Sequence, residues 1–123
     1  MTEHTNYIPL IVEKLKTLHP RKIILFGSCA YGDPTANSDI DLLVVTNSNR
    51  FPRNYREKSE LYLEVSRRIR DIRQQIPVDL IVHTAPMHKK FIDLGSLFSK
   101  EILQKGKVLY EADNQVVAEQ SVG

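Results

Sequence analysis

Residues 23–45, IILFGSCAYGDPTANSDIDLLVV, decide the fold and carry its most informative polar side chains. One apolar run of strand length opens this stretch and another closes it, with a polar connection between them. Gly27 and Ser28 follow the first run, and Asp39 and Asp41 open the second after ten intervening residues. Because strand side chains alternate between faces, the two aspartates are expected on one face, with Cα atoms about 7 Å apart.

Two carboxylates this close repel each other unless a cation lies between them. Burial and like charge would otherwise push a proton onto one of them, so an ionised pair at Asp39 and Asp41 indicates a bound divalent metal. A ligand set made of oxygen alone favours Mg²⁺ or Mn²⁺. The sequence therefore predicts a metal site at the start of the second strand.

Gly27 and Ser28, before the polar connection, predict a binding site for phosphate oxygens. Gly27 ends the first strand without a Cβ, and Ser28 stands where a short helix begins, with a hydroxyl and backbone N–H groups to offer. Phosphate seats beside paired carboxylates are typical of phosphoryl and nucleotidyl transfer. Taken singly, Asn37 to Asp39 would suit a turn, and Ser28 would suit a helix N-cap. A P-loop and an EF-hand are excluded, because the stretch lacks the Gly-Lys-Ser/Thr of one and the glycine and glutamate of the other.

The composite pattern resembles the minimal nucleotidyltransferases of the DNA polymerase beta superfamily. Their signature is Gly-Ser, ten residues and then Asp-x-Asp at the head of an apolar strand, followed by a third aspartate on a later strand. Gly27, Ser28, Asp39 and Asp41 match this signature, and Asp79, in the segment PVDLIV, takes the third position. The resemblance covers about the first 110 residues.

The chain departs from the family pattern just after the serine. Relatives often carry arginines in that position and two residues later, where this chain has Cys29 and Tyr31. Cys29 is interpreted as a small residue that packs behind the turn. The basic residues around the start of the second long helix are candidates for the cation that meets the triphosphate, namely Arg50, Arg53, Arg56 and Lys58.

Composition describes an ordinary globular protein. The chain has 123 residues, of which 41% are hydrophobic and 26% charged. Its net charge of +2 is too small to indicate nucleic-acid binding by itself. Residues 1–111 are expected to form the nucleotidyltransferase domain and 112–123 a flexible tail. No apolar run reaches membrane-spanning length and the N-terminus lacks a signal pattern, so no membrane association is expected. The lone cysteine excludes an internal disulfide and favours the reducing cytoplasm.

Apolar periodicity and Gly/Pro punctuation predict the remaining elements. Helices are expected over residues 5–18, 55–75 and 85–104, the last broken at Gly95 and Ser96, and strands over 78–83 and 107–111. Three arginines of the second helix recur every three residues and are expected on an exposed basic face that could dock an anionic partner: Arg67, Arg70 and Arg73.

Strand directions follow from the proposed chemistry. For Asp79 to meet Asp39 and Asp41, the second and third strands should run parallel, with the 55–75 helix as their crossover. The first strand should run antiparallel to the second. The expected fold class is therefore α/β (α+β): a mixed β-sheet of three core strands plus an edge strand, flanked by helices, in the polymerase beta-like nucleotidyltransferase fold.

The resemblance implies transfer of a nucleoside monophosphate, AMP from Mg²⁺-bound ATP, to an acceptor hydroxyl. It assigns the metals to Asp39, Asp41 and Asp79, and the β and γ phosphates to the turn of Gly27 and Ser28. Minimal nucleotidyltransferases are typically paired with a small helical HEPN toxin as its antitoxin, and some add AMP to a tyrosine of that partner. A chain of this length leaves no room for an acceptor domain, so either such a partner or a homo-oligomer is expected to bring the acceptor.

Two other functions stay open at this point. One is nucleotidyl transfer to a small molecule such as an aminoglycoside. The other is a non-catalytic binding module that neutralises a partner by contact, although a pure binder has no reason to retain a repulsive carboxylate cluster. Elongation of a nucleic acid is least favoured, because the chain has no evident track of aromatic and basic residues for a strand.

Overall fold

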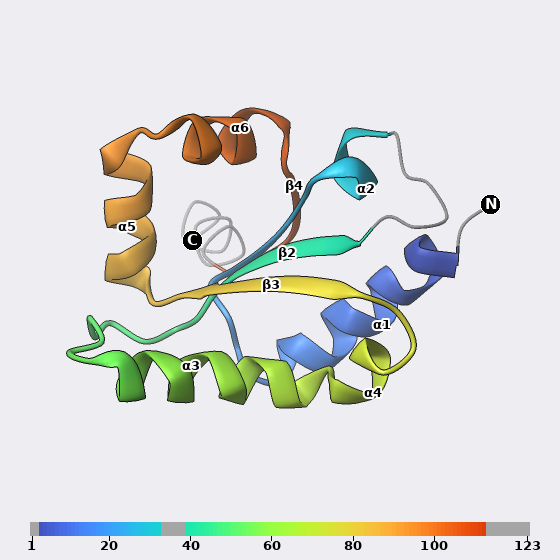
Figure 1. The fold of residues 1–123 in the computed structure, drawn as a ribbon, viewed down its shortest axis with the longest axis horizontal. Coiled ribbons are helices and arrows are strands. Elements are labelled where there is room, and N and C mark those ends of the chain that lie inside the picture. The colour runs from blue at the N-terminus through green and yellow to red at the C-terminus, as the bar shows by residue number, and fades with distance from the viewer. Residues whose placement is uncertain (1–2, 33–38, 113–123) are drawn as a thin grey trace, which may run out of the picture.

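The computed structural model of the protein describes residues 3–32 and 39–112. Each strand is separated from the next by one or two helices, as Figure 1 shows. In chain order they are α1 (Glu3–Lys16), β1 (Lys22–Phe26), α2 (Ser28–Tyr31), β2 (Ile40–Val45), α3 (Tyr55–Arg68), α4 (Arg70–Arg73), β3 (Val78–His83), α5 (Ala85–Leu94), α6 (Leu97–Lys105) and β4 (Lys107–Glu111).

The strands form one mixed sheet in the order β3-β2-β1-β4. β2 and β3 are parallel and are joined by the crossover that contains α3 and α4, whereas β1 is antiparallel to both β2 and β4. The β1 to β4 register shifts between Ile23 and Ile24. The predicted fold class is confirmed: a mixed sheet of three core strands with β4 as a fourth strand at the edge.

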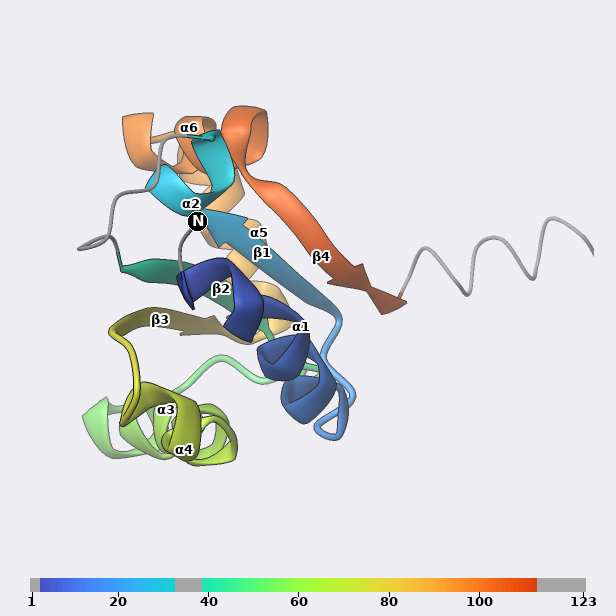
Figure 2. The same ribbon diagram turned by 90° about the vertical axis from the view of Figure 1, so that its right-hand side faces the viewer.

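Helices cover both faces of this sheet. Figure 2 shows α1, α3 and α4 on one side and α5 and α6 on the other. The larger buried cluster joins the first group to the sheet and includes Ile11, Leu15 and Val65. A smaller cluster joins α6 to the other face through Ile102, with Phe91 of α5 packed against it. Alternating strand residues thus supply two cores, because successive side chains point to opposite faces.

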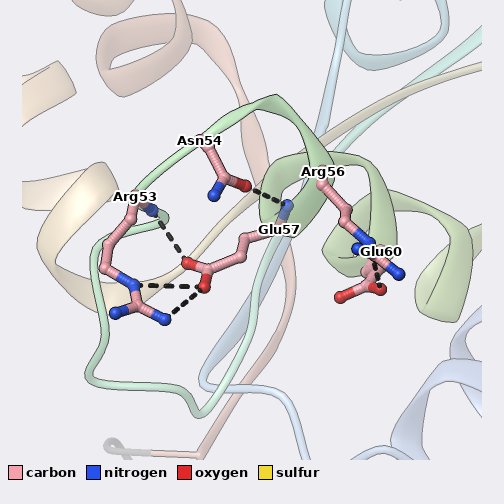
Figure 3. Close-up of polar contacts among 5 residues, drawn as sticks. All are labelled: Arg53, Asn54, Arg56, Glu57 and Glu60. Carbon is pink, nitrogen blue, oxygen red and sulfur yellow. Dashed lines mark hydrogen bonds and ion pairs between the residues drawn. The ribbon is translucent and has the colours of Figure 1, made fainter.

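The predicted helix over residues 55–75 is in fact two helices. Asn54 caps α3, its side chain accepting a hydrogen bond from the Glu57 N–H at 3.0 Å, as drawn in Figure 3. Ile69 then leaves the helical geometry at φ −113° and ψ 23° and is completely buried. Burying Ile69 in the core bends the chain between α3 and α4, a tertiary effect that helix periodicity does not encode.

The row of three arginines is not a shared exposed face. Arg73 turns inward, where its guanidinium donates to the Tyr62 hydroxyl at 2.9 Å, the Ser66 hydroxyl at 2.7 Å and the Val78 carbonyl at 3.1 Å. These bonds tie α4 to α3 and to the start of β3. The expectation that Arg73 faces solvent or a partner is therefore wrong.

The other predicted elements fall close to their observed bounds. The first helix was expected at 5–18 and ends earlier, at Lys16, after which His19 takes a positive φ of 54°. The predicted break at Gly95 and Ser96 is confirmed: Gly95 ends α5 in the left-handed conformation, and Ser96 caps α6. The irregular connection expected around Pro34 and Asn37 lies outside the described residues, as does all of the predicted tail except Ala112.

No helix within 3–32 or 39–112 combines the length and the apolar character needed to cross a membrane.

Candidate active site

The register of the two parallel strands brings carboxylates together. Asp41 of β2 pairs directly with Asp79 of β3, and residues paired across strands project from the same face. Asp39 immediately precedes β2. One carboxylate oxygen from each of Asp39, Asp41 and Asp79 lies within 4.8 Å of the others. The structure thus assembles the three aspartates that the sequence singled out from two separate segments.

This acidic triad, Asp39, Asp41 and Asp79, lies at the starts of β2 and β3, at the end of these strands away from α5. Asp41 shares its face with Leu43 and Val45, which belong to the core under α5 and α6. Figure 1 shows β2 and β3 starting at the right of the view, whereas α5 stands at the left, over their other ends. Asp79 is exposed, and the other two aspartates are partly buried. Solvent therefore has access to the triad from the side of Asp79.

The arrangement of the triad shifts the pKa of Asp41. Burial raises the pKa of Asp41 to about 6, with further contributions from the charge of Asp79, a hydrogen bond with Asp79 and the charge of Asp39. A pKa raised in this way means that the cluster carries more negative charge than the protein alone stabilises. A bound cation would relieve that repulsion.

The donor set fits a small divalent metal. All three groups are carboxylates, the ligands that Mg²⁺ and Mn²⁺ prefer. In an octahedral Mg²⁺ site opposite ligand oxygens stand roughly 4.2 Å apart, twice the usual metal–oxygen distance. Side-chain adjustment of a few tenths of an ångström would bring the 4.8 Å cluster within that span.

Gly27 is required by its contact with the triad. Its φ is +75°, which favours glycine, and a Cβ at this position would collide with the Asp41 Oδ2 atom and stand 3.0 Å from its Cγ. Gly27 is also the N-cap of α2, and no side chain caps that helix. Ser28 is therefore the first residue of the helix, and its interpretation as an N-cap is wrong. Among the described residues, its hydroxyl has no hydrogen-bond partner.

The two residues that replace the family's arginines have local roles. Cys29 is buried, and its thiol lies 3.5 Å from the Asp39 carbonyl oxygen. Burial, followed by the charges of Asp41 and Asp39, raises the pKa of Cys29, which keeps the thiol protonated and consistent with a packing residue. Tyr31 donates from its hydroxyl to Glu101 of α6 at 3.1 Å.

The basic residues proposed near the start of α3 are far from the triad. Figure 3 shows Arg53 and Arg56 engaged with Glu57 and Glu60, at 2.9 and 3.8 Å. They follow the end of β2, whereas the triad is at its beginning, and Figure 1 shows these ends on opposite sides of the molecule. Their proposed role as triphosphate partners is therefore unsupported. A cation near α2 that sequence reasoning missed is Lys105 of α6, whose ammonium lies 5.7 Å from the centre of the Tyr31 ring.

The sequence profile of the polymerase beta nucleotidyltransferase family matches residues 10–115, which include the whole triad and the Gly27 turn. The chain belongs to that family. A Methanocaldococcus jannaschii protein provisionally named as a protein adenylyltransferase is 30% identical over 90 residues, which span 73% of this chain and 78% of that protein.

The fold has a solved counterpart. A crystal structure of a provisionally assigned nucleotidyltransferase from Sulfolobus solfataricus superposes with a TM-score of 0.59, covering 89% of this chain and 82% of that one. At 22% sequence identity this likeness supports the fold alone. Members of the polymerase beta nucleotidyltransferase family generally act on nucleoside triphosphates with the help of divalent metal ions.

Proposed function

We propose that this family member transfers AMP from Mg²⁺-bound ATP to an acceptor hydroxyl. The acceptor oxygen forms a bond to the α-phosphorus, the bond from that phosphorus to the oxygen bridging toward the β-phosphate breaks, and pyrophosphate leaves with the bonding electrons. The proton of the acceptor passes to a base in the site. The meeting of Asp39, Asp41 and Asp79 beside the Gly27 turn is the observation that carries the proposal.

The residues of the site take distinct roles in this reaction. Asp39, Asp41 and Asp79 would hold the metal, which supplies charge stabilisation to the phosphate oxygens. Ser28 and the first N–H groups of α2 would hold the β and γ phosphates, since helix N-termini leave such donors without internal partners. We assign Asp79 the further task of orienting or deprotonating the acceptor. Its exposure supports this assignment, because an acceptor arriving from solvent meets Asp79 first.

We further propose that the acceptor is a tyrosine of a HEPN-type partner protein and that the chain acts as the antitoxin of that partner. The provisional name of the M. jannaschii relative, a protein adenylyltransferase, supports a protein acceptor. The motif resemblance supports the HEPN pairing. A tyrosine hydroxyl suits an open site such as this one, because a long side chain can reach the triad from a folded surface.

The test follows label and mass together. Purified protein, the product of the neighbouring gene, Mg²⁺ and ATP labelled at the α-phosphate are mixed, and both proteins are weighed by mass spectrometry. The partner should gain the mass of one or more AMP units on tyrosine. Asp41→Asn should abolish this gain, whereas Asp71→Asn, which changes an exposed carboxylate of α4 outside the triad, should leave it intact.

Two other results would each refute one part of the proposed function. Label on a small molecule and on no protein would refute the protein acceptor and support aminoglycoside-type chemistry. An unmodified partner that Asp41→Asn neutralises as well as the wild type does would refute catalysis and leave contact as the function.

A further inference from the structure

An apolar surface begins directly beside the acidic triad. Ile81 follows Asp79 by two residues on β3 and therefore lies on the same sheet face. Ile81 and Phe91 of α5 pack against the smaller core but keep part of their surface exposed. Phe98 of α6 is 44% exposed. We call Ile81, Phe91 and Phe98 the apolar shelf.

Ring contacts fix Phe98 close to the phosphate turn. Its ring packs edge to face with Phe26 at a centroid distance of 5.6 Å and with Phe91 at 5.9 Å. Phe26 immediately precedes Gly27 and is the cross-strand partner of Asp41. Since paired side chains on one face stand about 5 Å apart, Phe98 lies on the order of 10 Å from the Asp41 carboxylate.

Phe98 differs from the exposed leucines of α6 in its ring contacts. A single exposed leucine needs no explanation, and this applies to Leu97 at 87% and Leu103 at 50% exposure. Phe98 is instead packed against the rings of Phe26 and Phe91 while 44% of it stays exposed, and Phe26 immediately precedes the Gly27 turn. An aromatic ring fixed in this way is suited to stack on a planar ligand.

We propose that the apolar shelf binds the nucleobase of the triphosphate, with Phe98 as the stacking residue. This deepens the proposed function and rests on it. Carbon side chains line the shelf, so it recognises the flat surface of a base and makes no hydrogen bonds to its edges. The shelf therefore selects purine nucleotides by stacking area and distinguishes little between adenine and guanine.

The experiment separates base binding from phosphate binding. Isothermal calorimetry with Mg²⁺ measures the affinity of each variant for ATP, for GTP and for inorganic tripolyphosphate, which has no base. Phe98→Ala should weaken ATP and GTP binding about fivefold or more, the scale of one base stacked on an aromatic side chain, and leave tripolyphosphate binding unchanged. Phe98→Tyr keeps the ring and should bind ATP like the wild type. Leu97→Ala is the matched control and should change nothing.

Three outcomes with Phe98→Ala would overturn the shelf as the base site. The first is an ATP affinity that Phe98→Ala does not change. The second is an equal loss of ATP and tripolyphosphate binding, which would indicate structural damage. The third is a raised acceptor KM at unchanged ATP affinity, which would assign the shelf to the ring of an acceptor tyrosine. If the wild type bound tripolyphosphate and ATP equally well, only the proposal that the shelf binds the base would be refuted. If it bound neither compound, the proposed nucleotidyl transfer would be refuted as well.

Discussion

Replacing Asp41 by asparagine should stabilise the metal-free protein and remove its response to Mg²⁺. In the fold the pKa of Asp41 is about 6, against an ordinary value of 3.8. Folding therefore favours the protonated carboxyl. The contribution of Asp41 to the free energy of unfolding is fully present below pH 4 and is lost as the pH rises through 6. Asparagine resembles the protonated form and keeps that contribution at every pH.

The size of the effect follows from the shift. A rise of about two pKa units corresponds to roughly 3 kcal/mol between protonation states. Asp41 is in partial contact with solvent, which screens its charge, so about 1 to 2 kcal/mol is the expected gain in unfolding free energy at pH 8. For a domain of this size that gain raises Tm by about 4 to 8 °C. At pH 4 the two proteins should melt together.

Mg²⁺ should reverse the order of stability. At a concentration one hundred times its Kd, a ligand of the folded state adds about 2.7 kcal/mol to the free energy of unfolding. The wild type should gain this stability and Asp41→Asn should not, because the variant loses a charged ligand. Thermal melts followed by circular dichroism at pH 4 and pH 8, with EDTA or with Mg²⁺, measure all four states. Asp71→Asn serves as the control for removal of an exposed carboxylate.

Two results would refute this reasoning. A variant that melts below the wild type at pH 8 in EDTA would mean that Asp41 is stabilised as an anion by the protein itself. An equal rise in Tm for both proteins on adding Mg²⁺ would mean that the ion binds elsewhere.

Further predictions concern the Gly27 turn, the junction of α3 and α4, and the partly buried His83. Ser28→Ala should weaken ATP binding by about 1 to 3 kcal/mol in calorimetry, the scale of a hydrogen bond to a charged group; unchanged affinity would remove Ser28 from the phosphate site. Gly27→Ala should abolish transfer and lower the free energy of unfolding, measured in urea, by about 1 to 3 kcal/mol. The new Cβ would displace the Asp41 carboxylate, and alanine would be strained at this positive φ; an active, stable variant would contradict the observed contact. Arg73→Lys should lower unfolding free energy by about 1 to 3 kcal/mol, since lysine cannot reproduce its three hydrogen bonds; a urea midpoint equal to that of the wild type would contradict this. Burial and the charge of His88 lower the pKa of His83 to about 4, so stability present above pH 6.5 should fall as the pH drops toward 4; His83→Gln should flatten that dependence in urea midpoints.

Local pattern was enough to identify much of the candidate site. The spacing of Gly27, Ser28, Asp39 and Asp41 indicated a phosphate seat and a metal pair, because strand alternation determines which side chains share a face. Asp79 could be placed beside them once its segment was recognised as a strand and its direction was inferred from the chemistry. The antiparallel and parallel pairings, the break between α5 and α6 and the edge strand were predicted in the same way.

What the sequence determined by itself was therefore periodic and short in range: the elements, the faces of their side chains and the composite motif. Tertiary structure alone decided that Asp41 and Asp79 pair residue for residue and that Gly27 must lack a Cβ because Asp41 occupies that space. It brought Phe98 against Phe26, the residue before Gly27. It also turned Arg73 inward, against the helical period. Each of these contacts joins residues that are distant in the chain or depends on where Ile69 is buried. The local sequence pattern permits several strand registers. The packing of the whole core selects one of them, and no local periodicity encodes that packing.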